Sequence, residues 1–173
     1  MKRALFWLIV AAIPLSAGST VTWSAEKHPD QDFFKSAAEG GIAEVEAGKL
    51  AQSKGNSTAV KDFGAMMVKD HTEANAQLQS IAASQGVELP GSSSAMQMAS
   101  KAKLELLTGD TFDKAYIRNQ VAAHEQTVSL LKKEIASGSD AQAKAFATQV
   151  LPTIRGHLKK IRDIAAQAGI TTK

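Results

Sequence analysis

The stretch STAVKDFGAMMVKDHTEANAQLQSIAASQ, residues 57–85, decides the fold of this chain. Small and apolar residues recur in it every three or four positions, which is the spacing of one face of an α-helix. That face consists of Val60, Gly64, Met67, His71, Ala74, Leu78 and Ile81. Every member except His71 is apolar or small. The stretch therefore predicts an amphipathic helix whose core-facing side carries one polar residue near its middle.

Working outward from this stretch, the same spacing recurs in three more long segments and one short one. The helix-breaking residues lie between these segments, at Gly55-Asn56, 86–94, 108–110 and Gly138-Ser139. The chain carries almost no strand signal. The predicted helices cover 31–54, 57–85, 95–107, 111–137 and 140–168. We therefore expect an all-α fold, a ferritin-like four-helix bundle with one short extra helix in the crossover between the second and third long helices.

The helix ends carry capping signals. Asp30, Asn56 or Ser57, and Ser139 precede three of the predicted helices, where short polar side chains cap free backbone N–H groups. Short connections make the first two long helices antiparallel, and likewise the last two. The link of 25 residues before the third long helix leaves its orientation open. Pro152 lies inside the last predicted helix and should kink it.

Composition excludes several classes of function. The 173 residues include no cysteine, which excludes disulfides, thiolate metal sites and cysteine nucleophiles. Aromatic residues make up 5% of the chain, too few for a base-stacking surface. The net charge of +3 includes Lys2 and Arg3, so the chain beyond them is nearly neutral and nothing indicates nucleic-acid binding. No nucleophile elbow, phosphate loop or dinucleotide fingerprint is present.

The N-terminus has the features of a signal peptide. Lys2 and Arg3 precede an uncharged and mostly apolar run over 4–17, which is short for a membrane span. Cleavage is expected after Gly18, Ser24 or Ala25. We therefore expect a signal peptide over 1–25 and a single helical domain over 26–173, exported to a bacterial periplasm and without a membrane span after processing. An uncleaved N-terminal anchor is the alternative.

Each of the four long core-facing seams contains one polar residue near its middle. These residues are Glu44, His71, His124 and His157. Middle positions stay level whichever way a helix runs, so the four side chains should meet in one layer at the centre of the bundle. His157 is the least central, three residues past its midpoint, an offset of about 4.5 Å along the axis.

A buried layer of this kind needs partners. Burying an unpaired polar group costs about 2–7 kcal/mol. One transition-metal ion, whether Fe, Mn, Zn, Ni or Cu, would satisfy neutral imidazoles and a carboxylate. No histidine of the layer has a glutamate three residues before it, so the set suits one ion better than the two of di-iron bundles. A metal-free polar network, or a Glu–His⁺ pair, is the alternative.

Three neighbouring residues are candidates to support the layer. Asp70 could orient an imidazole on a neighbouring helix, which metal-bound histidines usually require. Gln120 lies one turn before His124 and could do the same. Met67 lies one turn before His71, as a soft copper ligand or as ordinary core packing. For Asp70, a solvated surface charge is the competing interpretation.

Several of these residues also carry a resemblance. The pattern of Glu44-Val45, 67–71, Phe112-Asp113 before Tyr116 and His124, and Leu151-Pro152 before His157 resembles a bacterial family of unknown function, over roughly residues 30–168. Members of that family are exported four-helix proteins with a ferritin-like fold, often labelled outer membrane proteins. The resemblance implies a ferritin-like bundle and export, and it supplies no activity.

Two functions follow as hypotheses. The first is a periplasmic metal-binding bundle that stores or buffers a metal or uses it in redox defence through a mononuclear site of three histidines and one glutamate. The second is a metal-free structural or interaction protein of the cell envelope, whose polar layer fixes the register of the helices. No catalytic constellation is evident. The sequence names no protein partner, and it is compatible with a homo-oligomer.

Overall fold

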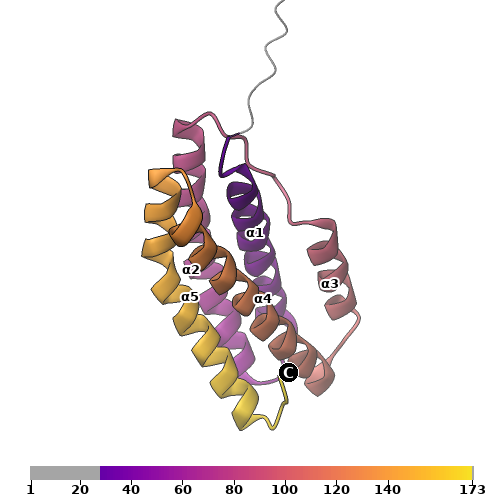
Figure 1. Ribbon diagram of the computed structural model, residues 1–173. Coiled ribbons are helices and arrows are strands. Elements are labelled where there is room, and N and C mark those ends of the chain that lie inside the picture. Colours follow the sequence, from indigo (N-terminus) through magenta and orange to yellow (C-terminus); the bar gives the residue numbers. More distant parts are fainter. Residues whose placement is uncertain (1–27, 173) are drawn as a thin grey trace, which may run out of the picture.

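A computed structural model describes residues 28–172, and in this part of the chain every regular element is a helix (Figure 1). The elements are α1 (Gln31–Lys54), α2 (Thr58–Ser84), α3 (Ala95–Glu105), α4 (Gly109–Ser137) and α5 (Ala141–Gln167). Each of the five predicted helices is present, so the all-α prediction is confirmed. The predicted signal peptide lies outside the described residues. No described helix has the length and hydropathy of a membrane-crossing segment.

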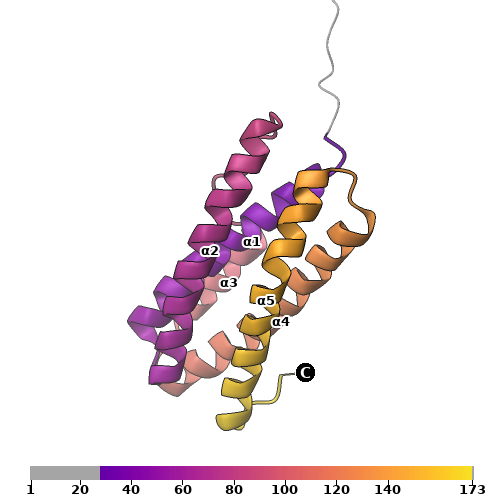
Figure 2. The same ribbon diagram turned by 90° about the vertical axis from the view of Figure 1, so that its left-hand side faces the viewer.

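The four long helices form two antiparallel pairs, α1 with α2 and α4 with α5, which lie side by side in Figure 2. The orientation that the sequence left open is settled by contacts at the helix ends. The Asp113 carboxylate near the start of α4 accepts hydrogen bonds from the backbone N–H groups of Asn56 and Ser57, at 2.8 Å each. Because α2 and α4 thus begin at the same end, they run parallel. The crossover between them spans the length of the bundle, and its short helix α3 packs outside α1 and α4.

The helix ends differ from the prediction in detail. Ser57 caps α2 as expected, since its hydroxyl accepts from the Val60 N–H at 3.3 Å. Asp140 rather than Ser139 caps α5, with Oδ1 at 2.7 Å from the Ala143 N–H. The helices predicted over 95–107 and 111–137 prove to be Ala95–Glu105 and Gly109–Ser137, because the break between them sits two residues earlier.

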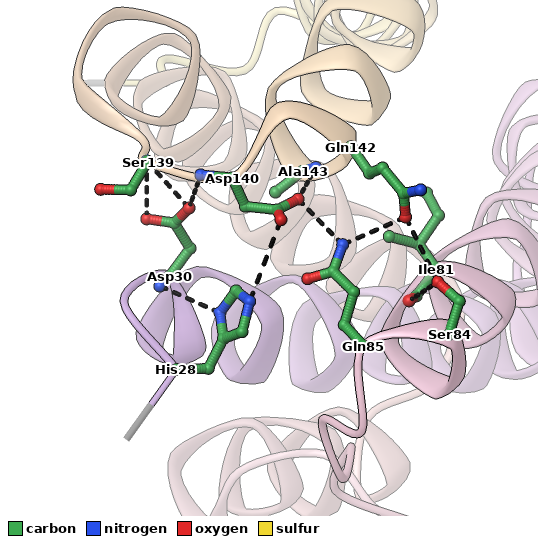
Figure 3. Close-up of polar contacts among 9 residues, drawn as sticks. All are labelled: His28, Asp30, Ile81, Ser84, Gln85, Ser139, Asp140, Gln142 and Ala143. Carbon is green, nitrogen blue, oxygen red and sulfur yellow. Dashed lines mark hydrogen bonds and ion pairs between the residues drawn. The ribbon is translucent and has the colours of Figure 1, made fainter. Parts of the chain in front are cut away.

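Asp30 was wrongly predicted to cap α1, because its carboxylate turns toward the other pair of helices. It accepts hydrogen bonds from the backbone N–H of Ser139, at 2.9 Å to Oδ2, and from that of Asp140 (Figure 3). Gln85, at the end of α2, donates to the Asp140 carboxylate at 2.9 Å. This network joins the start of α1, the end of α2 and the start of α5 at one end of the bundle.

Two apolar clusters fill the core. One lies toward the end where α1 and α2 connect and includes Phe63, Phe112 and Ile161. The other lies toward the Asp30 network and includes Phe34 and Leu78. Glu44, His71, His124 and His157 belong to neither cluster, although each is at most 5% exposed. A buried polar layer therefore divides the core near the middle of the bundle.

The closest packing in the bundle is between α1 and α2, where glycines of the two helices face each other. A Cβ atom on Gly48 would stand 2.7 Å from the Gly64 carbonyl oxygen, and a Cβ on Gly64 would stand 2.7 Å from that of Gly48. Neither atom can yield, because both carbonyls belong to helical backbone. The two glycines thus hold α1 and α2 at a separation that brings Glu44 and His71 into the same layer.

We predict that Gly48→Ala lowers the free energy of unfolding by about 1–3 kcal/mol, because the added methyl group forces the backbones apart. Gly156→Ala is the matched control, since a Cβ there meets nothing within 4 Å. It should raise the free energy of unfolding by about 0.5–1 kcal/mol by removing a glycine from a helix interior. Urea denaturation of both variants checks the pair, and equal effects would contradict the close approach.

Candidate metal centre

Three of the four predicted layer residues form a tight group. One ring nitrogen from each of His71, His124 and His157 lies within 4.8 Å of those of the other two. The ring centroids stand 5.6–5.9 Å apart. The axial offset expected for His157 therefore does not separate it from the others. A tetrahedral ion with bonds of about 2.1 Å holds its nitrogens about 3.4 Å apart, so small side-chain rotations would suffice to share one ion.

Hydrogen bonds fix the outer edge of two of these rings. Nδ1 of His124 lies 2.9 Å from the Gln120 carbonyl oxygen, which can only accept, so this nitrogen carries the proton. Nε2 of His157 lies 2.9 Å from Oδ2 of Asp70, across the seam between α2 and α5. In the neutral ring that nitrogen donates to the carboxylate. Both imidazoles therefore keep a free lone pair on the opposite nitrogen, which is how metal-binding histidines are usually held.

The inner edges of the rings have no hydrogen-bond partner in the part of the chain that the structure describes. Nε2 of His71, Nε2 of His124 and Nδ1 of His157 are buried and make no hydrogen bond. Leaving a buried acceptor unpaired costs about 1–3 kcal/mol. Two neutral imidazoles that both present lone pairs cannot satisfy each other. A cation or a water molecule held between the rings would satisfy these lone pairs.

The electrostatics of the group favour the uncharged forms of His71 and His157. Burial, together with repulsion from His124 and His157, lowers the pKa of His71 to about 3. Burial also lowers the pKa of His157, although the hydrogen bond that its ring donates to the Asp70 carboxylate opposes that shift. Neutral imidazole is the form that binds a metal, so these two rings are in the form that could bind one at neutral pH.

Glu44, the fourth predicted ligand, is buried beside the histidines but outside their group of three. Its carboxylate faces His124 and the side chain of Gln120. Burial raises the pKa of Glu44, while attraction to His124 and the hydrogen bond from Gln120 oppose the rise. One of its oxygens, Oε2, is buried without a partner. It would have to turn toward the cluster to reach an ion held there.

The supporting residues have different positions. Asp70 makes the contact to an imidazole on a neighbouring helix, although its role beside a metal stays a prediction. Gln120 holds His124 through its backbone and Glu44 through its side chain. Met67 is fully buried within the apolar cluster around Phe63. This position agrees with core packing, one of the two roles that the sequence left open for it.

Two aromatic residues of the site were not singled out from the residue pattern. Phe63 stands edge-on to His124 and His157, at 6.1 and 6.5 Å between ring centroids. It separates the histidines from the rest of the apolar cluster that includes Phe112 and Ile161. Phe63 lies eight residues before His71, so both residues fall on one broad face of the helix. The face described from the sequence was too narrow to include Phe63. Tyr116 is buried beside Glu44, and its hydroxyl has no partner.

We predict that Asp70→Asn weakens metal binding by about 10–100-fold, because an amide orients and polarises the His157 ring less than a carboxylate does. Asp62→Asn, an exposed change on the same helix, is the control and should leave affinity unchanged. Isothermal titration with Zn²⁺ compares the two variants. Equal affinities would show that the contact between Asp70 and His157 has no role in metal binding.

Comparison with known protein families assigns the chain to one of them. A family profile described as "Domain of unknown function (DUF4142)" matches residues 17–164. The chain belongs to this family. No curated protein matches it in sequence. Membership agrees with the resemblance to a family of unknown function and adds no activity.

Solved structures with the same fold come from a second family of unknown function. A DUF305 fragment from Deinococcus radiodurans is 12% identical, with a TM-score of 0.72, and the match covers 82% of this chain and 97% of that one. A DUF305 protein from Streptomyces coelicolor, which its description proposes to be secreted, is 13% identical, with a TM-score of 0.71 and coverage of 84% and 95%. At these identities the likeness shows the helical bundle fold alone. Neither comparison supports a ferritin relationship or an outer-membrane label.

Proposed function

We propose that this protein is a periplasmic metal-binding bundle that holds one transition-metal ion at His71, His124 and His157 and stores or buffers that metal or uses it in redox defence. Glu44 is the proposed fourth ligand. Asp70 and Gln120 are proposed to hold the ligating rings in place. The observation that carries the proposal is the set of three buried ring nitrogens without partners, gathered in one layer.

The residues fit a transition metal better than other ions. Imidazole nitrogen suits Zn, Cu, Fe and Ni, whereas Mg and Ca prefer oxygen ligands. The bound ion would supply the positive charge that the inner lone pairs lack. A carboxylate at the fourth position would admit Mn as well and would lower the net charge of the buried site.

Export to the periplasm is proposed from the N-terminal sequence. The charged start, the apolar run over 4–17 and the small residues that follow are typical of a cleaved signal peptide. The description of the Streptomyces protein, a structural relative, points the same way. Mass spectrometry of the exported protein should find a new N-terminus between Gly18 and Ala25.

One observation favours the metal-free alternative. The lowered pKa values of His71 and His157 and the raised pKa of Glu44 all favour uncharged forms. An uncharged layer with bound water could persist without an ion and serve only to fix the register of the helices. Such a layer would tolerate replacement by apolar residues, as some buried polar groups do.

Metal analysis of the protein purified from its native periplasm decides between the two functions. We expect close to one equivalent of a transition metal, and one equivalent taken up again after removal with a chelator. The matched control is a variant with His71, His124 and His157 all replaced by leucine. Less than ~0.1 equivalent in the native protein, with no uptake on titration, would favour the structural function.

A further inference from the structure

A cavity between α2 and α5 connects two of the buried histidines to the surface. This cavity has a volume of about 250 Å³ and is lined by His71 and His157 at its inner end. Glu73, Gln149 and Thr153, which also line it, are exposed. The cavity therefore runs from the surface to two of the three proposed ligands, and it is large enough for a hydrated ion.

The lining of this cleft has one sign of charge. Asp70 and Glu73 supply two carboxylates, and among residues 28–172 no lysine or arginine lines the cavity. Asp70 is partly exposed, with 25% of its side chain accessible, while its Oδ2 contacts the His157 ring. A cation that entered the cleft would first meet the exposed carboxylate of Glu73. It would then meet the less exposed carboxylate of Asp70, which contacts the proposed ligand His157.

A second, smaller cleft reaches the layer from the opposite side. It has a volume of about 100 Å³ and lies between α1, α3 and α4, with Glu44 and Gln120 among its lining residues. Glu46 and Lys101 give it charges of both signs, and none of the three histidines lines it. An ion that came this way would have to pass Glu44 and Gln120 before it met an imidazole.

We propose that a hydrated divalent transition-metal ion reaches the site through the cleft between α2 and α5, attracted by Glu73 and passed to the histidines beside Asp70. This inference rests on the proposed function, because it concerns the route to the same site. A focused negative potential in a cleft raises the rate at which cations arrive. It leaves the ligands of the bound ion, and so the equilibrium affinity, largely unchanged.

Stopped-flow absorbance with Co²⁺ on the mature chain tests the route. Thr153→Trp should obstruct the cleft and slow association and dissociation together by about 10-fold or more, with the equilibrium affinity and the Co²⁺ spectrum preserved. Thr148→Trp, the same change at an exposed position of α5 outside the cleft, should leave both rates unchanged. Glu73→Gln should slow association about 3-fold at low ionic strength, and this effect should vanish in high salt.

Glu46→Gln probes the opposite cleft and should not alter the association rate. Slower association in Glu46→Gln with normal association in Glu73→Gln would overturn the proposed route. Equal rates in Thr153→Trp and Thr148→Trp would also overturn it. Failure of the wild-type protein to bind Co²⁺ at all would instead refute the proposed function, a result that is distinguished before any rate is compared.

Discussion

Replacing His71 and His124 together with alanine should lower the affinity for Zn²⁺ or Co²⁺ by about 1000-fold or more, equivalent to about 4 kcal/mol of binding free energy. The variant keeps only the inner nitrogen of His157 and the carboxylate of Glu44, and two ligands from different helices hold an ion poorly. The decrease in the free energy of unfolding should be much smaller than this loss of binding free energy. The change removes two buried ring nitrogens that lack partners, which offsets part of the cost of the cavity it creates.

His28→Ala is the control for this prediction. It removes the fourth histidine of the chain, which lies at the end of the bundle with its Nε2 at 4.0 Å from the Asp140 carboxylate. Its affinity should equal that of the wild type in competition titrations with a chromogenic chelator. Circular dichroism should show unchanged helicity in both variants. Unchanged metal binding in the double variant would end the account of the site.

The stability of the metal-free protein should fall steeply in mild acid. The pKa of His71 is about 3 in the folded chain, whereas an unfolded histidine titrates near 6.5. Between these values the unfolded state binds one more proton than the folded state, so the free energy of unfolding decreases as pH falls. From pH 7 to pH 5, His71 alone should cost about 2 kcal/mol, and the lowered pKa of His157 adds to the loss.

Urea denaturation in the presence of a chelator, at pH 7, 6 and 5, measures this dependence. His71→Leu is the comparison, because it removes the titrating ring and leaves the rest of the layer in place. The variant should lose about 2 kcal/mol less than the wild type over the same range. The raised pKa of Glu44 acts in the opposite direction and is common to both proteins. Parallel losses in the two proteins would contradict a neutral, buried His71.

Much of the fold could be predicted from the sequence because helix periodicity and breakers are local signals. The spacing around His71 predicts α2 to within one residue at either end. One mispredicted helix cap, Asp30, depends on contacts between distant segments. Asp30 precedes a helix and has the chemistry of a cap, but the backbone N–H groups of the connection between α4 and α5 compete for its carboxylate. The parallel arrangement of α2 and α4 is likewise shown by a long-range contact, between Asp113 and Asn56, which lie 57 residues apart.

The candidate site could be predicted in part for the same reason. Periodicity places each histidine on a core-facing seam, and the middle of a bundle is one layer whichever way its helices run. The spacing of residues along the sequence does not determine the rotamer that each side chain adopts within that layer. Glu44 accordingly shares the layer and faces His124, yet it also pairs with the Gln120 side chain and stands outside the group of three histidines. The contact between Asp70 and His157 depends on the axial position of α5 against α2, which the crossover sets.

Anomalous X-ray diffraction from crystals of the Zn²⁺-loaded mature protein, recorded on both sides of the zinc absorption edge, tests the central claim most directly. We predict one strong peak among His71, His124 and His157, with nitrogen–metal distances of about 2.0–2.2 Å. The peak should disappear in crystals of the variant with His71 and His124 both replaced by alanine. A peak only at the Asp30 and Asp140 end of the bundle, or no peak in a protein whose three rings stay together, would contradict the account.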